Sequence, residues 1–165
     1  MCFKGYVGGS FYHHTGAAVE PLCLPKDPEW GRYSDRTVDN ARGFVYGAEY
    51  EHTGVFRLNL HNNDVPCAVC ETHDHESVVI IPARKSCYAG WKKEYSGYLM
   101  SGKFDHRAAT TYSCLDEKSQ PLHGGFENKD GYLFYPVESR CKHGSLRCPP
   151  YYQGRELTCV VCSKD

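Results

Sequence analysis

Ten cysteines are spread along the 165 residues of this chain, and they restrict its fold and its compartment more than any other feature. A chain of this size rarely keeps so many thiols in a reducing cytosol unless they bind a metal or carry out redox chemistry. We therefore expect a disulfide framework and a secreted, extracellular protein. The first thirty residues lack the apolar segment of a signal peptide, so we expect the sequence to be that of a mature form.

The aromatic and turn-forming residues indicate an all-β fold. Thirteen Tyr and seven Phe favour strands because rings fit a half-buried pleated surface, and sixteen Gly and nine Pro favour turns between them. No window has a long 3.6-residue apolar stripe, so we expect little helix. The predicted strands are Gly43 to Glu51, Ala68 to Thr72, Ser77 to Ile81, Gly97 to Met100, Tyr132 to Val137 and Leu157 to Val161.

The sequence also repeats itself at an offset near 90 residues, for example 97 − 5 = 92 for a shared Gly-Tyr pair. The landmarks are of the same kind and in the same order, which indicates duplication of one structural unit. The matches are Gly5-Tyr6 with Gly97-Tyr98, Cys23-Leu24 with Cys114-Leu115, Glu49 with Glu138, and Cys67-Ala-Val-Cys70 with Cys159-Val-Val-Cys162.

Each copy is too short to bury much apolar surface by itself. We therefore predict a single domain over residues 1–165, built from two repeated halves with a pseudo-twofold relation. The halves span about residues 3–70 and 87–162, and residues 71–86 join them.

The repeat divides the cysteines into two sets of four and one further pair. Residues i and i+3 of a strand point to opposite faces, so the two cysteines of each CxxC should have different partners. One cysteine of each CxxC is expected to bridge back to Cys23 or Cys114, and Cys141 is expected to bond to Cys148. A zinc site built from both CxxC pairs is the alternative. We favour disulfides because the pairs lie 159 − 70 = 89 residues apart in apolar, strand-like contexts.

Charge and motifs argue against several functions. Nineteen basic and twenty acidic residues give a net charge of −1 with mixed signs, so we expect no nucleic-acid partner. No apolar run approaches the length of a membrane span, so we expect no membrane insertion. The sequence lacks the local signatures of hydrolases, metalloproteases and phosphate-binding loops, so we predict that the protein is not an enzyme.

Several longer motifs are specific enough to suggest a family. They are Gly47-Ala-Glu-Tyr-Glu51, His61-Asn-Asn-Asp-Val-Pro-Cys-Ala-Val-Cys70, Ile81-Pro-Ala-Arg84, Cys87-Tyr-Ala-Gly-Trp91, Glu94-Tyr-Ser-Gly-Tyr-Leu-Met100, Cys148-Pro-Pro-Tyr151 and Gly154-Arg-Glu-Leu-Thr-Cys-Val-Val-Cys162. Together they resemble the C-terminal module of the short-chain collagen C4-like proteins of marine invertebrates. A module without a Gly-x-y collagen tract, like this chain, is similar to galactose-binding sea-anemone lectins of the AJLec type.

This resemblance implies a calcium-dependent, homodimeric lectin that recognises galactose-terminated glycans through sugar hydroxyls coordinated to Ca2+. The alternative is a structural module of the extracellular matrix that does not bind sugar, as the collagen-linked relatives suggest. Agglutination that is abolished by a chelator and by free galactose distinguishes the two.

Calcium takes six to eight oxygen ligands, so we looked for oxygen-rich turns. The first candidate is Glu127, Asn128 and Asp130, next to a glycine that permits close backbone approach. Its repeat counterpart is Asp39 with Asn40. An ordinary hairpin turn is the alternative interpretation of the first segment. The next candidates are Asn62, Asn63 and Asp64, and then His73, Asp74, His75 and Glu76.

Galactose recognition requires polar groups for the hydroxyls and a ring for the apolar face of the sugar. Near the first calcium candidate, we expect Asn128, Lys129 and His123 to contact hydroxyls. The candidate aromatic platforms are Trp30, Trp91, Tyr33 and Tyr132, although packing is the commoner role for a ring in a thin β core.

Overall fold

The computed structural model describes residues 2–16, 18–29, 44–51, 54–71, 77–141 and 145–164. Within these ranges the chain is all-β and contains no helix, as predicted, and so none that could cross a membrane. The strands are β1 (Cys2–Gly9), β2 (Leu22–Pro25), β3 (Tyr46–Tyr50), β4 (Pro66–Cys70), β5 (Ser77–Pro82), β6 (Lys92–Ser101), β7 (Ser113–Asp116), β8 (Tyr132–Pro136) and β9 (Thr158–Lys164).

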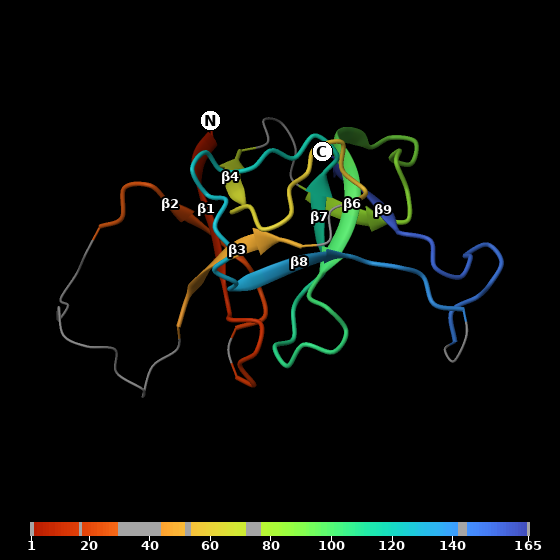
Figure 1. The fold of residues 1–165 in the computed structure, drawn as a ribbon. Helices are drawn as coiled ribbons and strands as arrows, with labels where there is room; N and C mark the ends of the chain where they lie inside the picture. The colour runs from red at the N-terminus through yellow and green to blue at the C-terminus, as the bar shows by residue number, and fades with distance from the viewer. Residues whose placement is uncertain are drawn as a thin grey trace.

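The strands form one curled, half-barrel sheet in the order β2-β1-β3-β8-β6-β9-β5, with β4 added to β1 and β7 added to β6. β1 pairs antiparallel with β2, β3 and β4, and β6 pairs antiparallel with β7, β8 and β9. β3 and β8 pair in parallel and run between the two groups, as Figure 1 shows. This parallel pair is the structural link between the two ends of the sheet.

Strands β1 and β6 each approach a neighbouring strand very closely at a glycine, β1 at Gly5 and β6 at Gly97. A Cβ on Gly5 would lie 1.9 Å from the carbonyl oxygen of Leu24, and a Cβ on Gly97 would lie 1.7 Å from that of Leu115. Real Cβ atoms do not approach backbone so closely, so both positions require glycine. Glycine-rich β1 and the four-residue strands β2 and β7 were not predicted, because glycine and short length remove the usual strand signal.

The main core lies on one face of the central β3–β8 pair. Ala48 and Tyr50 of β3 and Tyr132 and Phe134 of β8 are buried there. Successive residues of a strand face opposite sides, so Glu49 and Glu51 are directed to the other face. Further buried members of this core are Phe56, Leu60, Val65 and Met100, and a second cluster contains Leu99, Cys114, Cys159 and Val161.

All ten cysteines are paired in five disulfides, so none offers a free thiolate to zinc. The two cysteines of each CxxC have different partners. The bonds are Cys2–Cys70, Cys23–Cys67, Cys87–Cys162, Cys114–Cys159 and Cys141–Cys148.

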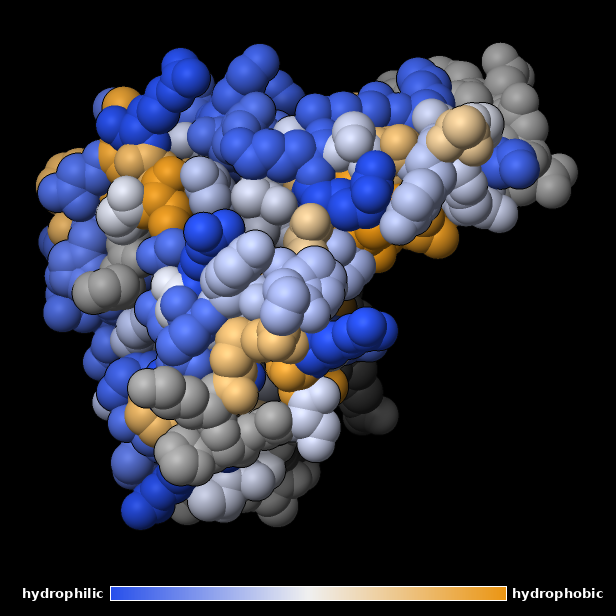
Figure 2. All heavy atoms as spheres, turned by 90° about the vertical axis from the view of Figure 1, so that its right-hand side faces the viewer, coloured by the Kyte–Doolittle hydropathy of each residue, from blue (hydrophilic) through white to orange (hydrophobic). Residues whose placement is uncertain are grey.

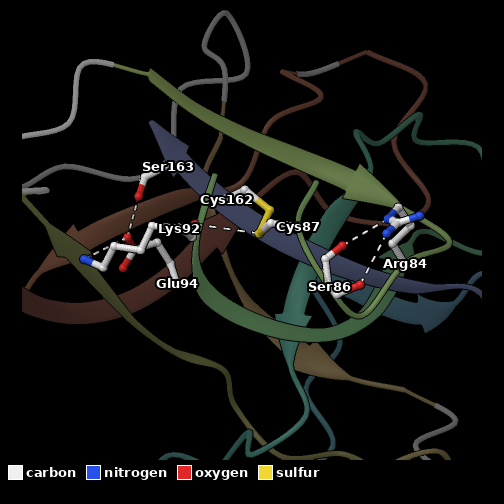
Figure 3. Close-up of a disulfide and its surroundings, with 7 residues drawn as sticks. All are labelled: Arg84, Ser86, Cys87, Lys92, Glu94, Cys162 and Ser163. Carbon is white, nitrogen blue, oxygen red and sulfur yellow. Dashed lines mark hydrogen bonds and ion pairs between the residues drawn. A yellow bond between two sulfur atoms is a disulfide. The ribbon is translucent and has the colours of Figure 1, made fainter. Parts of the chain in front are cut away.

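The Cys87–Cys162 disulfide fastens the turn after β5 to strand β9 (Figure 3). Next to it, the hydroxyl of Ser163 donates a hydrogen bond to the Glu94 carboxylate, which lies 3.3 Å from the Lys92 ammonium. These contacts join β9 to β6 by side chains as well as by the backbone ladder. Polar and charged residues cover most of the face in Figure 2, and its apolar residues form small separate patches.

Candidate functional site

Three carboxylates meet on the face of β3 opposite the core. Glu49 and Glu51 of β3 and Asp130, two residues before β8, each offer an oxygen, and these oxygens lie within 4.8 Å of one another. Glu49 and Glu51 share a face because they are two residues apart on one strand. Asp130 joins them because β8 pairs in parallel with β3, from Ala48 opposite Tyr132 to Tyr50 opposite Phe134. We call these three residues the acid cluster.

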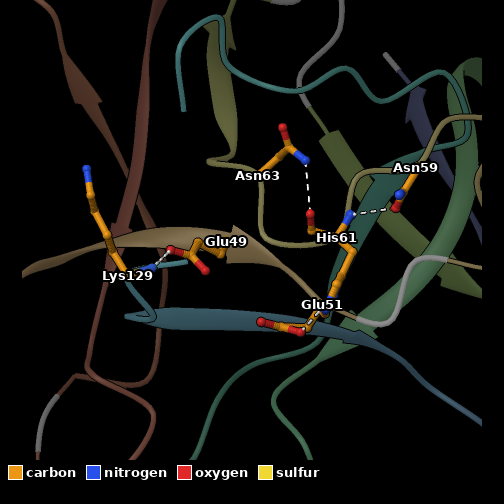
Figure 4. Close-up of polar contacts among 6 residues, drawn as sticks. All are labelled: Glu49, Glu51, Asn59, His61, Asn63 and Lys129. Carbon is orange, nitrogen blue, oxygen red and sulfur yellow. Dashed lines mark hydrogen bonds and ion pairs between the residues drawn. The ribbon is translucent and has the colours of Figure 1, made fainter. Parts of the chain in front are cut away.

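The backbone just before β8 is shaped to bring Asp130 against β3. Asp130 has a φ of 58° and Gly131 a φ of 126°. A Cβ on Gly131 would lie 2.2 Å from the carbonyl oxygen of Gly47, so only glycine permits this approach. As a result, the backbone N–H of Lys129 donates a 2.7 Å hydrogen bond to Oε1 of Glu49 (Figure 4).

Glu49 is an unusual carboxylate because it is only 1% exposed. Its Oε1 accepts the Lys129 bond, but its Oε2 is buried with no hydrogen-bond partner among the described residues. Burial raises the pKa of Glu49 above its ordinary 4.5; the Lys129 bond lowers it, and the charges of Asp130, Asp64 and Glu51 raise it further. A buried oxygen without a partner is costly, and a bound cation would remove that cost.

Glu51 is 8% exposed and contacts a histidine from the loop after β3. Nδ1 of His61 lies 3.1 Å from Oε2 of Glu51. The backbone of His61 is itself held: its N–H donates to Oδ1 of Asn59, and its carbonyl accepts from Nδ2 of Asn63 (Figure 4). The loop therefore positions one carboxylate of the acid cluster from the side opposite Lys129.

Three partly exposed rings lie beside the acid cluster. The His106 ring is 4.6 Å from the Tyr12 ring and 5.5 Å from the Tyr135 ring, centre to centre. Burial, with smaller contributions from the charges of Glu51, Asp130 and others, raises the pKa of Tyr135 to about 12. Burial also lowers the pKa of His106, so its ring is neutral near pH 7. The N–H of Tyr12 donates to the carbonyl of Gly131 at 2.8 Å, which ties the rings to the strand entry beside Asp130.

Of the first calcium candidate, the structure brings only Asp130 into the acid cluster. Glu127 is exposed and its carboxylate pairs with the Lys129 ammonium at 2.7 Å, which lowers the pKa of Glu127. Asn128 is exposed as well. The repeat counterpart, Asp39 with Asn40, lies outside the described residues.

The predicted sugar contacts are placed less favourably. Tyr132 is 1% exposed and packs in the core, where its hydroxyl is directed at the carbonyl of Val19, so its ring has no face for a sugar. That assignment is wrong because the even-numbered residues of β8 face the core. His123 and Lys129 are exposed, and no contact joins His123 to the acid cluster in the described part of the chain.

The two remaining candidate segments have different outcomes. In the first, Asp64 uses its backbone: its N–H donates to Gly125 at 2.8 Å and its carbonyl accepts from Leu122 at 3.0 Å. Asn62 has a φ of 60° and shapes the turn, while the Asn63 amide bonds to His61. This segment lies next to the acid cluster, but none of its side chains belongs to the cluster. The second segment, His73, Asp74, His75 and Glu76, lies outside the described residues.

Sequence reasoning did not identify Glu49 and Glu51 as site residues, although both lie in a predicted strand. Two carboxylates at positions i and i+2 of an otherwise apolar strand share one face. Charges rarely become buried there unless a partner or an ion compensates them. That pattern was the available signal. The third carboxylate could not be found this way, because Asp130 is about 80 residues distant in the sequence (130 − 49 = 81).

Comparisons of the chain with protein-family models, with curated proteins and with solved structures found no match in any of the three. The resemblance to the collagen-linked modules and lectins therefore stays a prediction. The geometry of the acid cluster and its flanking rings carries the functional argument.

Proposed function

We propose that this chain is a secreted, calcium-dependent carbohydrate-binding protein, with Glu49, Glu51 and Asp130 as its calcium ligands. The observation that carries the proposal is Oε2 of Glu49, a buried carboxylate oxygen without a partner among the described residues. All three side chains supply oxygen, the ligand atom that calcium requires. Five disulfides support an oxidising, extracellular location.

Electrostatics favours a divalent cation at this position. Two unit charges 4.8 Å apart repel by about 3 kcal/mol at an effective dielectric constant of ~20. The three carboxylates therefore destabilise each other. Burial is the main cause of the raised pKa of Glu49, and the charges of Asp130 and Glu51 add to it. A calcium ion turns this repulsion into attraction and supplies a Lewis-acidic centre to which neutral hydroxyls bind.

The carboxylates fill only part of a calcium coordination shell, which has six to eight oxygens. We propose that two hydroxyls of a terminal galactose complete it, as the resemblance to galactose-binding lectins implies. Tyr12, His106 and Tyr135 are the rings next to the acid cluster and are better placed than Tyr132 to cover the apolar face of the sugar. Asn128 and Lys129 precede Asp130 and remain candidates for hydroxyl contacts.

We further propose that the sheet arose by duplication and that its halves are related by a pseudo-twofold axis. What supports this is the recurrence of backbone contacts: Val7 N–H donates to Val65, and Leu99 N–H to Leu157. The acid cluster is the single carboxylate group of its kind in the described ranges, so we assign one sugar site per chain. Cross-linking of cells then requires a homodimer.

The test is calorimetric titration of the protein with galactose, first in calcium and then in EDTA. We expect binding in calcium and none in EDTA. Glu49→Gln should abolish the calcium-dependent binding, while Glu138→Gln, the same change at the exposed repeat counterpart, should leave it intact. Galactose binding that persists in EDTA or in Glu49→Gln contradicts the proposed site. Calcium binding without any galactose binding supports the matrix-module alternative instead.

A further inference from the structure

A second site lies on the other side of β3 from the acid cluster. It is a pocket of about 450 Å³, within the usual size range of small-ligand sites. The position of the pocket follows from Tyr50, whose side chain faces away from Glu49 and Glu51. The Tyr50 hydroxyl donates a hydrogen bond to the carbonyl of Gln120, and Gln120 lines the pocket. The Tyr50 ring also contacts Phe56, which in turn contacts Tyr98 of the pocket wall.

The pocket is basic in a protein that is slightly acidic. Arg57, Lys85 and Lys118 line it together with one carboxylate, that of Glu117, so its formal charge is 3 − 1 = +2. The chain as a whole has a charge of −1. The three cations come from separate segments, after β3, after β5 and after β7, so the fold gathers them. Charge of one sign in a hollow attracts ligands of the opposite sign.

The wall beside these cations is apolar. Val55 and Tyr98 pack against the core with part of their surface open, and Leu58 is 53% exposed. Ser119 and Gln120 add neutral polar groups to the lining. Anions with no carbon skeleton, such as phosphate, would leave the apolar wall uncovered. A sugar ring has an apolar face for Tyr98 and hydroxyls for Ser119 and Gln120, so the combination favours a saccharide that carries a negative group.

We infer that this pocket binds an anionic saccharide, whose sulfate or carboxylate is held by Arg57, Lys85 and Lys118 while its ring covers Leu58 and Tyr98. The guanidinium and the two ammonium groups supply charge-assisted hydrogen bonds to the anion. The acid cluster takes no part, so this binding does not require calcium. The protein would then bind two features of a glycan at separate sites. The acid cluster, on one side of β3, binds neutral hydroxyls, and the pocket, on the other side, binds a negative group.

The experiment is an NMR titration of the isotope-labelled protein in EDTA, which removes calcium from the proposed calcium site. Three probes share one ring: galactose 6-sulfate, galacturonic acid and neutral galactose. We expect chemical-shift changes at Arg57, Tyr98 and Lys118 for a charged probe, with affinity about tenfold above that of galactose. Binding of the sulfate, the carboxylate or both supports the proposal and identifies the source of the charge. Absence of binding by both charged probes overturns it.

Two variants locate the site, and a third tests whether loss of a positive charge elsewhere on the surface matters. Arg57→Gln with Lys118→Gln should weaken binding about tenfold, whereas Lys4→Gln, at an exposed position of β1, should leave it unchanged. Leu58→Ala should weaken binding severalfold without changing any charge. An equal loss in Lys4→Gln, or none in Leu58→Ala and in the double variant, overturns the proposal. Glu49→Gln should not change binding of the charged probes in EDTA. A failure of this pocket to bind them is therefore distinguishable from a failure of the proposed calcium site.

Discussion

Residues 49–51 and 138–140 have the same backbone contacts but different side-chain surroundings. The Tyr50 N–H donates to the carbonyl of Asn63, and the Tyr50 carbonyl accepts from the N–H of Asn62. In the same way, the Ser139 N–H donates to the carbonyl of Arg155, and the Ser139 carbonyl accepts from the N–H of Gly154. In the first stretch both glutamates are buried, but in the second both Glu138 and Arg140 are exposed. Only the first has Lys129 and Asp130 packed against it.

The comparison teaches that the same backbone contacts can hold side chains in very different surroundings. The turn opposite each stretch has a residue in the left-handed conformation at the matching position: φ is 60° at Asn62 and 73° at Gly154. The difference arises from the side chains and from the loop that covers them. A buried carboxylate oxygen without a hydrogen-bond partner is costly. Among the described residues of these two stretches, Oε2 of Glu49 is such an atom, and this is where we propose an ion.

The largest expected effect on stability is the loss of a disulfide on either side. Cys23–Cys67 and Cys114–Cys159 close chains of nearly equal length, with separations of 44 and 45. The chain-entropy estimate therefore assigns about 4 kcal/mol to each bond. Cys114 and Cys159 are also buried, so we expect their replacement by alanine to cost about 1 kcal/mol more than that of Cys23 and Cys67. Chemical denaturation of both double variants measures this, and equal losses would remove burial as a factor.

The next effect tests whether the close strand crossings are equivalent. Gly97→Ala and Gly5→Ala each place a Cβ into a backbone carbonyl, so we expect each to cost about 3 kcal/mol of unfolding free energy. Gly47→Ala is the control, because no heavy atom lies within 4 Å of its Cβ position. A melting temperature that is unchanged in Gly97→Ala but lowered in Gly5→Ala would show that the two crossings are not equivalent.

A third prediction concerns the calcium affinity of the two stretches. Removing one carboxylate charge by Glu49→Gln should lower the affinity for calcium about 100-fold, or about 2.7 kcal/mol. Without calcium the same variant should be more stable than the wild type, because a buried charge has been removed. Glu138→Gln should change neither quantity. Calcium titration followed by thermal unfolding checks both, and a loss of affinity in Glu138→Gln would refute the asymmetry.

The pH dependence of stability should also change in Glu49→Gln and not in Glu138→Gln. Because its pKa is raised, Glu49 keeps its proton to higher pH in the folded state than in the unfolded state. Its contribution to stability is therefore complete below its ordinary pKa of 4.5 and is lost as the pH rises through the raised value. In EDTA, stability relative to Glu49→Gln should fall as the pH rises above 4.5 and through the raised pKa. Glu138→Gln should follow the wild-type profile; a flat difference between wild type and Glu49→Gln contradicts the raised pKa.

The smallest expected effect is that of the histidine beside Glu51. His61 is half exposed, so its contact with Glu51 should contribute no more than about 0.5 kcal/mol. His61→Ala should therefore change stability little and calcium affinity less than Glu49→Gln does. In the other stretch, Gln153 occupies the matching position and accepts a hydrogen bond from the backbone of Cys141. Gln153→Ala is the matched control, and a larger effect of His61→Ala on calcium affinity than that of Glu49→Gln would make His61 part of the site.

Much of the fold was predictable because its signals are local. Alternating apolar residues and aromatic content indicated the strands near Tyr46, Ser77 and Tyr132, and the spacing of each CxxC implied separate disulfide partners. Strands β1, β2 and β7 were missed because their recognition depends on neighbours that a short or glycine-rich segment does not reveal. The candidate site was found only in part, through Asp130.

The sequence by itself determined the all-β class, the disulfide framework and the positions of most strands, since these depend on residue type and short-range spacing. Only the tertiary structure decided that β3 and β8 pair in parallel, which brings Glu49 and Glu51 to Asp130 and turns Tyr132 into the core. Likewise, only folding gathers Arg57, Lys85 and Lys118 around one pocket. Contacts between residues tens of positions apart depend on which strands pair, and local sequence does not encode that choice.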